Sequence, residues 1–169
     1  MTVARALALV DLVHAAPPNT DLAVAIVAVL ESHGESAVEL SADDVRDLVA
    51  VCGRLRAVLV APDRDTAAAG LNALLAEHAG PPRLVRHEGW DWHVHVDAGD
   101  DAPWAAWLAS SAALALASRL AAAADVPWGD CAAGCGRVYV HDGRGGPRRY
   151  CSTTCATRER VRRHRSINR

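Results

Sequence analysis

Two closely spaced cysteine pairs, with fifteen residues between them, decide the fold of the C-terminal part of the chain: Cys131-Ala-Ala-Gly-Cys135 and Cys151-Ser-Thr-Thr-Cys155. Paired thiols with an insert of this size bring four sulfur atoms together as a tetrahedron around one ion, as in structural zinc sites. The first pair lies in a glycine-containing turn. The second pair lies where Ser152 or Thr153 caps a new helix, whose positive end favours a thiolate. We therefore predict one structural Zn²⁺ per chain, bound by all four cysteines.

Two disulfide bonds are the alternative explanation of this spacing. The N-terminal residues make a poor signal peptide, so we expect a cytoplasmic protein, in which thiols stay reduced. His141 or His164 is an alternative ligand in place of one cysteine. Four thiolates saturate the ion and leave no open position for a substrate. We therefore expect the metal to fold the module, and we expect no enzymatic activity.

Charge is divided unevenly between the two parts of the chain. Residues 1–130 carry 8 arginines against 18 acidic residues, whereas residues 131–169 carry 10 arginines against only Asp142 and Glu159. This asymmetry indicates that the basic end binds a polyanion. Four arginines after the second cysteine pair fall within about 60° of one another on a helix, and two more precede that pair. The predicted nucleic-acid-binding residues are Arg148, Arg149, Arg158, Arg162, Arg165 and Arg169.

An arginine stripe on a metal-anchored helix suits the phosphates of DNA. Val161, on the same helix, is expected to face the small core of the module. Other interpretations of the stripe remain open. In the first, the arginines belong to a solvated tail. In the second, they contact the acidic N-terminal part of the same chain. In the third, they dock on an acidic partner protein or on a second copy of the chain.

The first 126 residues are predicted to form a mostly helical domain. Apolar spacing, capping residues and helix breakers place helices at about 3–14, 20–33, 41–61, 65–78 and 102–124. Apolar and polar residues alternate from Trp90 to Asp97, which predicts one strand of a hairpin within residues 83–97. The expected fold is therefore mainly α with a small β-hairpin. It consists of a helical N-terminal domain over 1–126 and a treble-clef-like zinc module over 127–169.

Polar residues of the predicted hairpin are a weaker candidate for function. His93 and His95, flanked by Asp91 and Asp97, lie on one face of the strand. We expect this face to be solvated. The alternative is a second metal site or a catalytic site, which His87 joins only if the register of the hairpin allows it.

The tryptophans and the fifth cysteine are interpreted as core residues. Trp90, Trp92, Trp104 and Trp107 are expected to pack inside the domain, and the alternative is a pocket for a small-molecule effector between them. Cys52 lies on the apolar face of a helix and is expected to be a buried thiol. Every apolar stretch is interrupted by a charge or proline before the length of about 18 residues that spans a membrane. We therefore expect no membrane partner.

The C-terminal pattern resembles the CGNR zinc finger. That finger reads approximately Cys-x3-Cys, an aromatic strand, Asp-x-Ser-Arg, Arg-Arg-Trp-Cys-Ser, Cys-Gly-Asn-Arg and a basic helix. This sequence differs from it at Gly143-Arg144-Gly145, at Tyr150 and at Ala156-Thr157, and it keeps all four cysteines. The resemblance is carried by Cys131-x3-Cys135, Val138-Tyr139-Val140, Asp142, Arg148-Arg149-Tyr150-Cys151-Ser152, Cys155-Ala156-Thr157-Arg158 and Val161-Arg162-Arg163-x-Arg165.

In that family the finger follows a helical domain called ABATE, and part of the N-terminal sequence is similar to it. The similar segments are Arg54-Leu55-Arg56, Leu71-Asn72-Ala73-Leu74-Leu75 and the helix before Trp128. The family is regarded as one of stress-induced transcriptional regulators. The resemblance therefore implies a zinc-dependent regulator that binds DNA through the finger, with an N-terminal domain for effector sensing or homodimerisation.

Overall fold

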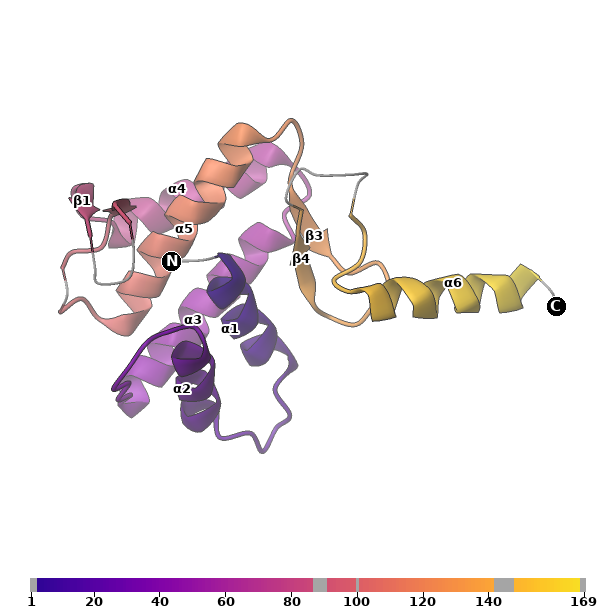
Figure 1. The fold of residues 1–169 in the computed structure, drawn as a ribbon, viewed down its shortest axis with the longest axis horizontal. Coiled ribbons are helices and arrows are strands. Elements are labelled where there is room, and N and C mark those ends of the chain that lie inside the picture. Colours follow the sequence, from indigo (N-terminus) through magenta and orange to yellow (C-terminus); the bar gives the residue numbers. More distant parts are fainter. Residues whose placement is uncertain (1–2, 87–90, 100, 142–147, 168–169) are drawn as a thin grey trace.

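Six α-helices and two antiparallel two-stranded sheets make up the described part of the computed structural model, which omits residues 1–2, 87–90, 100, 142–147 and 168–169 (Figure 1). The predicted fold class, mainly α with a small hairpin and a C-terminal four-cysteine module, is confirmed. The helices are α1 (Val3–Ala15), α2 (Leu22–Ser32), α3 (Ala42–Leu59), α4 (Arg64–His78), α5 (Trp104–Ala122) and α6 (Thr153–Ile167). The strands are β1 (Arg83–Val85), β2 (His93–His95), β3 (Trp128–Asp130) and β4 (Val138–Val140).

Local capping explains where the helices begin. The Ser41 hydroxyl accepts a hydrogen bond from the Asp44 amide at 3.1 Å, and the Asp44 carboxylate accepts one from the Ser41 amide at 3.0 Å. This reciprocal pair is the capping box that the sequence predicts. Helix α2 is capped by Asp21, which accepts from the Val24 amide, so the cap lies one residue later than predicted.

The core of the body formed by α1 to α5 is built from leucine, valine and alanine. Helix α5 packs against α4 and α3, while α1 packs against α3 and α2. Leu9, Leu55 and Leu108 are at most 1 % exposed, and they come from three different helices of this cluster. Cys52 is 2 % exposed, as predicted, and burial raises the pKa of its thiol to about 12.

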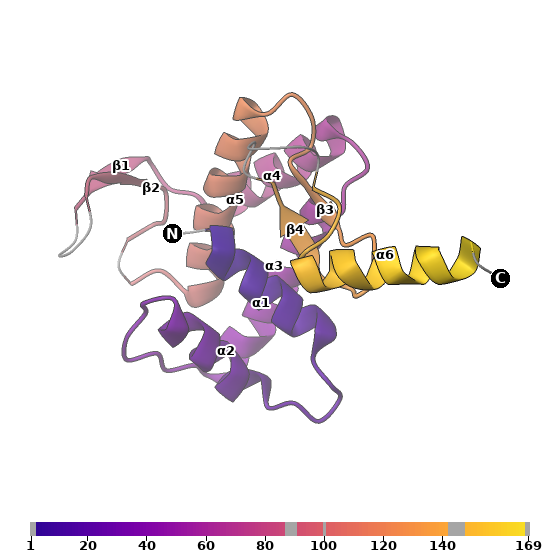
Figure 2. The same ribbon diagram turned by 45° about the vertical axis from the view of Figure 1, so that its right-hand side comes forward.

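Helix α5 is long and apolar enough to span a membrane by length and composition alone. The same two properties are found in the central helices of folded domains. Here Leu108, Ala112 and Leu116 lie within the common core, and α5 packs against both α4 and α3 (Figure 2). In this fold α5 therefore serves as the central helix of the bundle.

The hairpin β1–β2 forms as predicted, but the alternation does not separate buried from exposed side chains as expected: Val96 is buried, whereas Trp92 and Val94 are not. The apolar side chains Trp92 and Val94 are 59 % and 51 % exposed, whereas Asp97 just beyond β2 is only 4 % exposed. Alternation shows that two faces differ, and it does not show which one turns toward the protein. Ion pairs of Asp97 with Arg83 and His95 hold the polar face inward.

The tryptophans divide between the core and the surface. Trp104 and Trp107 stack edge to face with their centroids 5.5 Å apart and pack against the core, as predicted. Arg5 lies over the Trp107 ring at 4.8 Å from its centroid, so an intrachain contact already covers that ring. Trp92 is exposed, contrary to the expectation, and Trp90 lies outside the described residues.

The strands β3 and β4 join the C-terminal module to the helical body. The Trp128 indole donates a hydrogen bond at 3.0 Å to the Val58 carbonyl of α3, and Arg56 of α3 pairs with Asp130 at 2.9 Å. On the other side, the Asp11 carboxylate of α1 accepts from the Val138 amide at 3.1 Å. Trp128, Val138 and Val140 belong to the same apolar cluster as the helices. The base of the module is thereby packed on the bundle.

Candidate metal centre and basic helix

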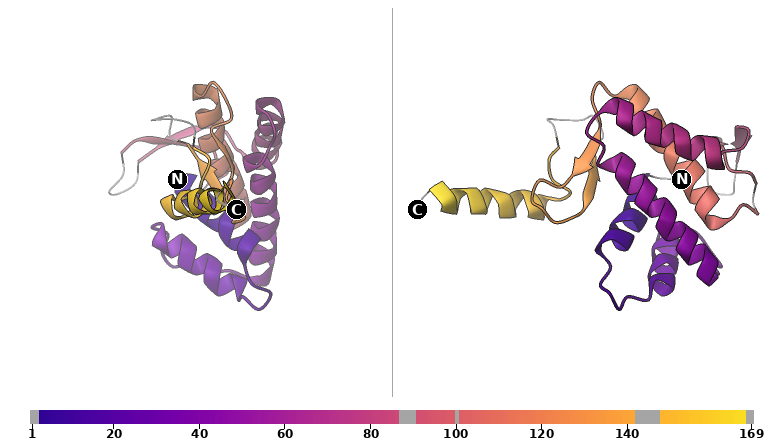
Figure 3. Two further views of the ribbon diagram at one scale, coloured as in Figure 1. Left: turned by 90° about the vertical axis from the view of Figure 1, so that its right-hand side faces the viewer. Right: turned by 180° about the vertical axis from the view of Figure 1, so that it is seen from behind.

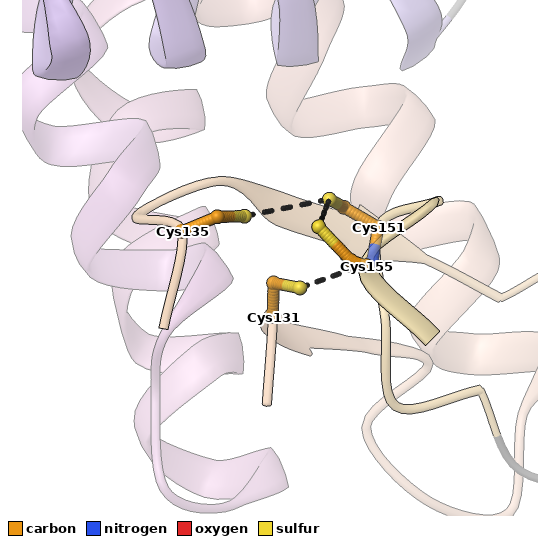
Figure 4. A group of neighbouring side chains, drawn as sticks. All are labelled: Cys131, Cys135, Cys151 and Cys155. Atoms are coloured by element: carbon orange, nitrogen blue, oxygen red, sulfur yellow. Dashed lines mark hydrogen bonds between the residues drawn. The ribbon is translucent and has the colours of Figure 1, made fainter. Parts of the chain in front are cut away.

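Four cysteine sulfurs converge at the end of the β3–β4 sheet that faces α6 (Figure 4). All four sulfur atoms lie within 4.8 Å of one another. The Sγ of Cys151 is 3.5 Å from that of Cys135 and 3.7 Å from that of Cys155. A tetrahedral ion with Zn–S bonds of about 2.3 Å requires sulfur atoms about 3.8 Å apart. The observed separations therefore fit one Zn²⁺.

The backbone around the first cysteine pair is shaped for this purpose. Gly134 and Gly136 have φ values of +65° and +77°, a region that side-chain-bearing residues rarely adopt. The Gly134 amide donates to the Cys131 carbonyl at 2.9 Å, which closes a tight turn between the two cysteines. Across the module, the Cys151 amide points at the Cys131 sulfur at 3.4 Å. Amide donors of this kind stabilise thiolates.

The four sulfurs affect one another's ionisation. Burial opposes ionisation of Cys131, but hydrogen bonds from the backbone amides of Cys151 and Ala133 outweigh it and lower its pKa to about 7. For Cys151, burial and then its hydrogen bonds to the neighbouring thiols raise the pKa to about 12. In the metal-free state this cluster therefore resists full ionisation. A divalent cation in the middle is what stabilises all four thiolates together.

The alternatives to a four-cysteine zinc site receive no support from this geometry. All five cysteines are free of disulfide bonds, and the separation of 3.5 Å between the sulfur atoms of Cys135 and Cys151 exceeds a bonded S–S distance of about 2.05 Å. Among the described residues, the four cysteines are the only group of three or more potential metal ligands close enough together to share one ion, and neither His141 nor His164 belongs to it. The site can hold one Zn²⁺, with four sulfur ligands that leave no open coordination position.

Arg148 stabilises the turn before the second cysteine pair. Its guanidinium donates to the carbonyls of Cys151 at 2.7 Å and Tyr150 at 2.9 Å, with a longer contact to Val140 at 3.4 Å. The planar fork of an arginine suits several carbonyls at once. Arg148 is therefore a structural residue of the zinc module in addition to being a predicted DNA contact.

Helix α6 begins at the metal centre and projects away from the rest of the molecule (Figures 1 and 3). The Ser152 hydroxyl accepts from the Cys155 amide at 3.2 Å, so the predicted cap is present. With fifteen residues the helix is about 22 Å long. Its described side chains from Arg160 to Ser166 are exposed on every side, so the prediction that Val161 faces the core is wrong. The Val161 side chain is 44 % exposed, and the ribbon of α6 extends away from the helical body (Figure 3).

The predicted nucleic-acid-binding arginines fall into two groups. Arg158 lies against the metal centre, with its guanidinium 3.5 Å from the Ala133 carbonyl and 3.7 Å from the Cys155 sulfur. Arg162 forms a bidentate ion pair at 2.8 Å with Glu159, one turn earlier. Arg149 and Arg165 are exposed, and Arg169 lies outside the described residues. Arg160 and Arg163 of α6 are likewise exposed, and neither forms an ion pair with a residue of the described ranges.

Two features of the site were not anticipated. Strand β3, which begins at Trp128, was not predicted, because three residues are too few to show the alternation of a strand. The tryptophan directly after Pro127 is the one sequence signal for a strand there. The roles of Arg148 and Arg158 in holding carbonyls and sulfur were also missed, because a single sequence does not distinguish structural arginines from exposed ones. Figure 4 shows the four cysteine side chains that converge at the site.

Comparison with known families agrees with this geometry. Residues 128–166 match the family model of the CGNR zinc finger, which spans both cysteine pairs and most of α6. The match begins at the first residue of β3 and leaves the helical body outside it. A comparison with curated proteins found no match.

Proposed function

We propose that this chain, with its CGNR-type zinc finger, is a DNA-binding transcriptional regulator whose α6 contacts the DNA backbone. The observation that carries the proposal is the basic helix that projects from the metal centre, clear of the body (Figure 3). Its only acidic residue among those described, Glu159, is already neutralised by Arg162. The remaining charge is positive and directed outward, as an electrostatic footprint for phosphates requires.

The contacts within the chain indicate which arginines would carry the binding. Arg148 and Arg158 are engaged by carbonyls and sulfur of the module, and Arg162 is engaged by Glu159. We therefore assign the main phosphate contacts to Arg149, Arg160, Arg163 and Arg165, with the other predicted arginines in support. Zinc would act indirectly, because it fixes the start of α6 and so the direction in which these side chains point.

The helical body would supply regulation in this proposal. The resemblance to ABATE domains of stress-induced regulators gives it an effector-sensing or dimerisation role. A homodimer would suit the exposed apolar side chains of the hairpin, Leu84, Trp92 and Val94, which are 51–65 % exposed. A surface depression at the start of α4 is lined by Pro62, Asp63, Arg64, Asp65, Asp125 and Val126, and none of the tryptophans lines it.

Duplex-DNA binding measured by fluorescence anisotropy across a salt series tests the proposal. The change is Arg163→Gln with Arg165→Gln, and the matched control is Arg46→Gln with Arg86→Gln, which removes the same charge from the body. Loss of two phosphate contacts should lower the slope of log affinity against log salt by about 2. The control should leave that slope unchanged. Binding that ignores salt, or that is equal in the wild type and the α6 variant, would refute the assignment.

The competing function is a protein-interaction module whose basic helix docks on an acidic partner. The acidic body of a second copy is one such surface, because residues 1–130 carry ten more acidic residues than arginines. Light scattering at low salt separates the two functions. Self-association that disappears in the Arg163→Gln, Arg165→Gln variant, together with DNA affinity weaker than millimolar, would favour this second function.

A further inference from the structure

The inward face of the β1–β2 hairpin carries a second group of metal-ligating side chains, at the opposite end of the molecule from the cysteines (Figure 1). His93 and His95 are half-buried there, and the Asp97 side chain is 4 % exposed. The backbone at this place is fixed, because the Gly80 amide at the end of α4 donates to the Val96 carbonyl at 2.6 Å. The face is therefore an ordered polar site rather than a solvated strand.

Each imidazole is held through its Nδ1 atom. His93 Nδ1 is 2.7 Å from the Asp91 carbonyl oxygen, and His95 Nδ1 is 2.9 Å from a carboxylate oxygen of Asp97. Both partners are acceptors, so the hydrogen-bond network assigns a hydrogen to Nδ1 of each ring. Asp97 is itself held by Arg83, whose guanidinium donates to the second carboxylate oxygen at 2.5 Å.

The other ring nitrogens point at each other. The Nε2 atom of His93 is 2.9 Å from the Nε2 atom of His95. With both Nδ1 atoms protonated, two neutral rings would present two lone pairs at this distance, which is repulsive. One additional positive species between the nitrogens removes the repulsion. That species is either a shared proton or a metal ion.

We propose that this His93–His95 pair is a second metal site, which binds one divalent transition-metal ion through the two Nε2 atoms. In metal sites the ligating imidazole donates its other N–H to a carboxylate or a backbone carbonyl, which orients the ring and raises its basicity. Asp97 and the Asp91 carbonyl supply one partner of each kind. Metal–nitrogen bonds of about 2.0–2.1 Å at a tetrahedral angle place two nitrogens about 3.3–3.4 Å apart, so small ring movements admit the ion.

The donor set defines the ion and the character of the site. Imidazole nitrogen suits Zn²⁺, Ni²⁺ and Cu²⁺, and it does not suit Mg²⁺ or Ca²⁺. Two protein ligands leave further coordination positions to water or to a bound molecule. This ion would therefore exchange readily, unlike the zinc held by four thiolates. The proposal concerns the hairpin alone and stands or falls independently of DNA binding.

Titration of the full, zinc-loaded chain with Ni²⁺ tests the proposal, with no affinity tag that contains histidines. We expect one Ni²⁺ per chain by calorimetry, with the zinc of the cysteine site retained in metal analysis. His93→Ala and His95→Ala should each abolish this binding. Asp97→Asn should weaken it by about 10- to 100-fold, because the ring of His95 loses its charged partner.

His33→Ala is the matched control, because it removes an imidazole whose Nδ1 contacts only the local turn of α2. It should leave Ni²⁺ binding intact. His93→Ala is the decisive variant, since its Nδ1 contact is to a backbone carbonyl and the buried Asp97 keeps both of its partners. An unchanged melting temperature in that variant confirms that the fold persists. No binding by the wild type up to millimolar Ni²⁺, or equal binding by His93→Ala, would show a shared proton only and overturn the proposal.

Discussion

The helical body and the zinc finger are stabilised by different interactions. In the body, large side chains from several helices, such as Leu9, Leu55 and Leu108, are almost completely buried in one cluster. Among the described residues of the finger, only Trp128, Val138 and Val140 belong to the buried part of that cluster, and all three lie on its two short strands. The second cysteine pair and α6 lie outside this apolar cluster.

This difference shows which part of the molecule depends on the metal. Burial of apolar side chains stabilises the body by about 1.5–3 kcal/mol per large residue, with no ion involved. The far half of the finger has no comparable core, and its chain is held by cysteine ligands, Arg148 and the Ser152 cap. We therefore expect the position of α6 to depend on zinc binding, and the fold of the body to be independent of it.

Loss of one zinc ligand should separate the two regions most strongly. We expect Cys151→Ser to lose the zinc ion and the order of α6, while the body keeps its helices. Structural zinc contributes an apparent 10–16 kcal/mol in finger peptides, which exceeds what the few apolar contacts of the finger supply. Metal analysis gives the zinc content, and circular dichroism gives the helix that remains.

Cys52→Ser is the control for this experiment, because it makes the same chemical change inside the body. Its hydroxyl would be buried without a suitable partner, so we expect a loss of about 1–3 kcal/mol in the unfolding free energy. Zinc content should stay at one ion per chain. Retention of zinc by Cys151→Ser would contradict the assignment of the four ligands.

A substitution that creates a cavity in the body should lower the stability of the body and leave zinc binding unchanged, the reverse of the result expected for Cys151→Ser. Leu55 of α3 is 0 % exposed, so Leu55→Ala is expected to destabilise the body by about 2–5 kcal/mol. Zinc content should not change in the folded protein. The control is Val161→Ala on α6, where the side chain is 44 % exposed and the expected effect is within about 0.5 kcal/mol. Chemical denaturation followed by tryptophan fluorescence measures both. Equal effects at the two positions would show that α6 is packed after all.

The contrast also explains how much could be predicted from the sequence. Caps, breakers and apolar spacing act within a few residues, so the helices and the capping box at Ser41 were predictable. The cysteine ligands were predictable for a similar reason, because the metal imposes a spacing that the chain displays directly. Both kinds of signal are local.

Features that depend on contacts between distant segments were not predictable. The inward face of β2 is decided by Asp97 with Arg83 and by the attachment of Gly80 to Val96, and no alternation pattern contains that information. The division of the arginines is decided in the same way, by carbonyls that reach Arg148 only after folding. Val161 was assigned to a core because its spacing is helical, although its side chain is 44 % exposed in the structure.

The interface between the helical body and the finger can be tested at Asp11, whose carboxylate links α1 to β4 by accepting a hydrogen bond from the Val138 amide. Burial is the largest influence on this carboxyl and raises its pKa, although the Val138 amide and Arg137 oppose the shift. A raised pKa in the folded state means that the folded protein binds the proton more tightly than the unfolded chain. This contribution to stability is therefore greatest below the ordinary pKa of 3.8 and is lost as the pH rises through the folded pKa.

Asp11→Asn should thus leave stability at neutral pH unchanged or slightly higher, because the amide oxygen still accepts from Val138 and no charge is buried. Asp11→Ala leaves that N–H without an acceptor and should lower the unfolding free energy by about 1–2 kcal/mol. Thermal melts from pH 4 to pH 7 measure the difference between each variant and the wild type. Relative to Asp11→Asn, the wild type should become less stable as the pH rises above 3.8. If the wild type instead gains stability relative to Asp11→Asn in that range, the attraction of the Asp11 carboxylate to Arg56 and Arg137 is stronger than the cost of burying its charge at this interface.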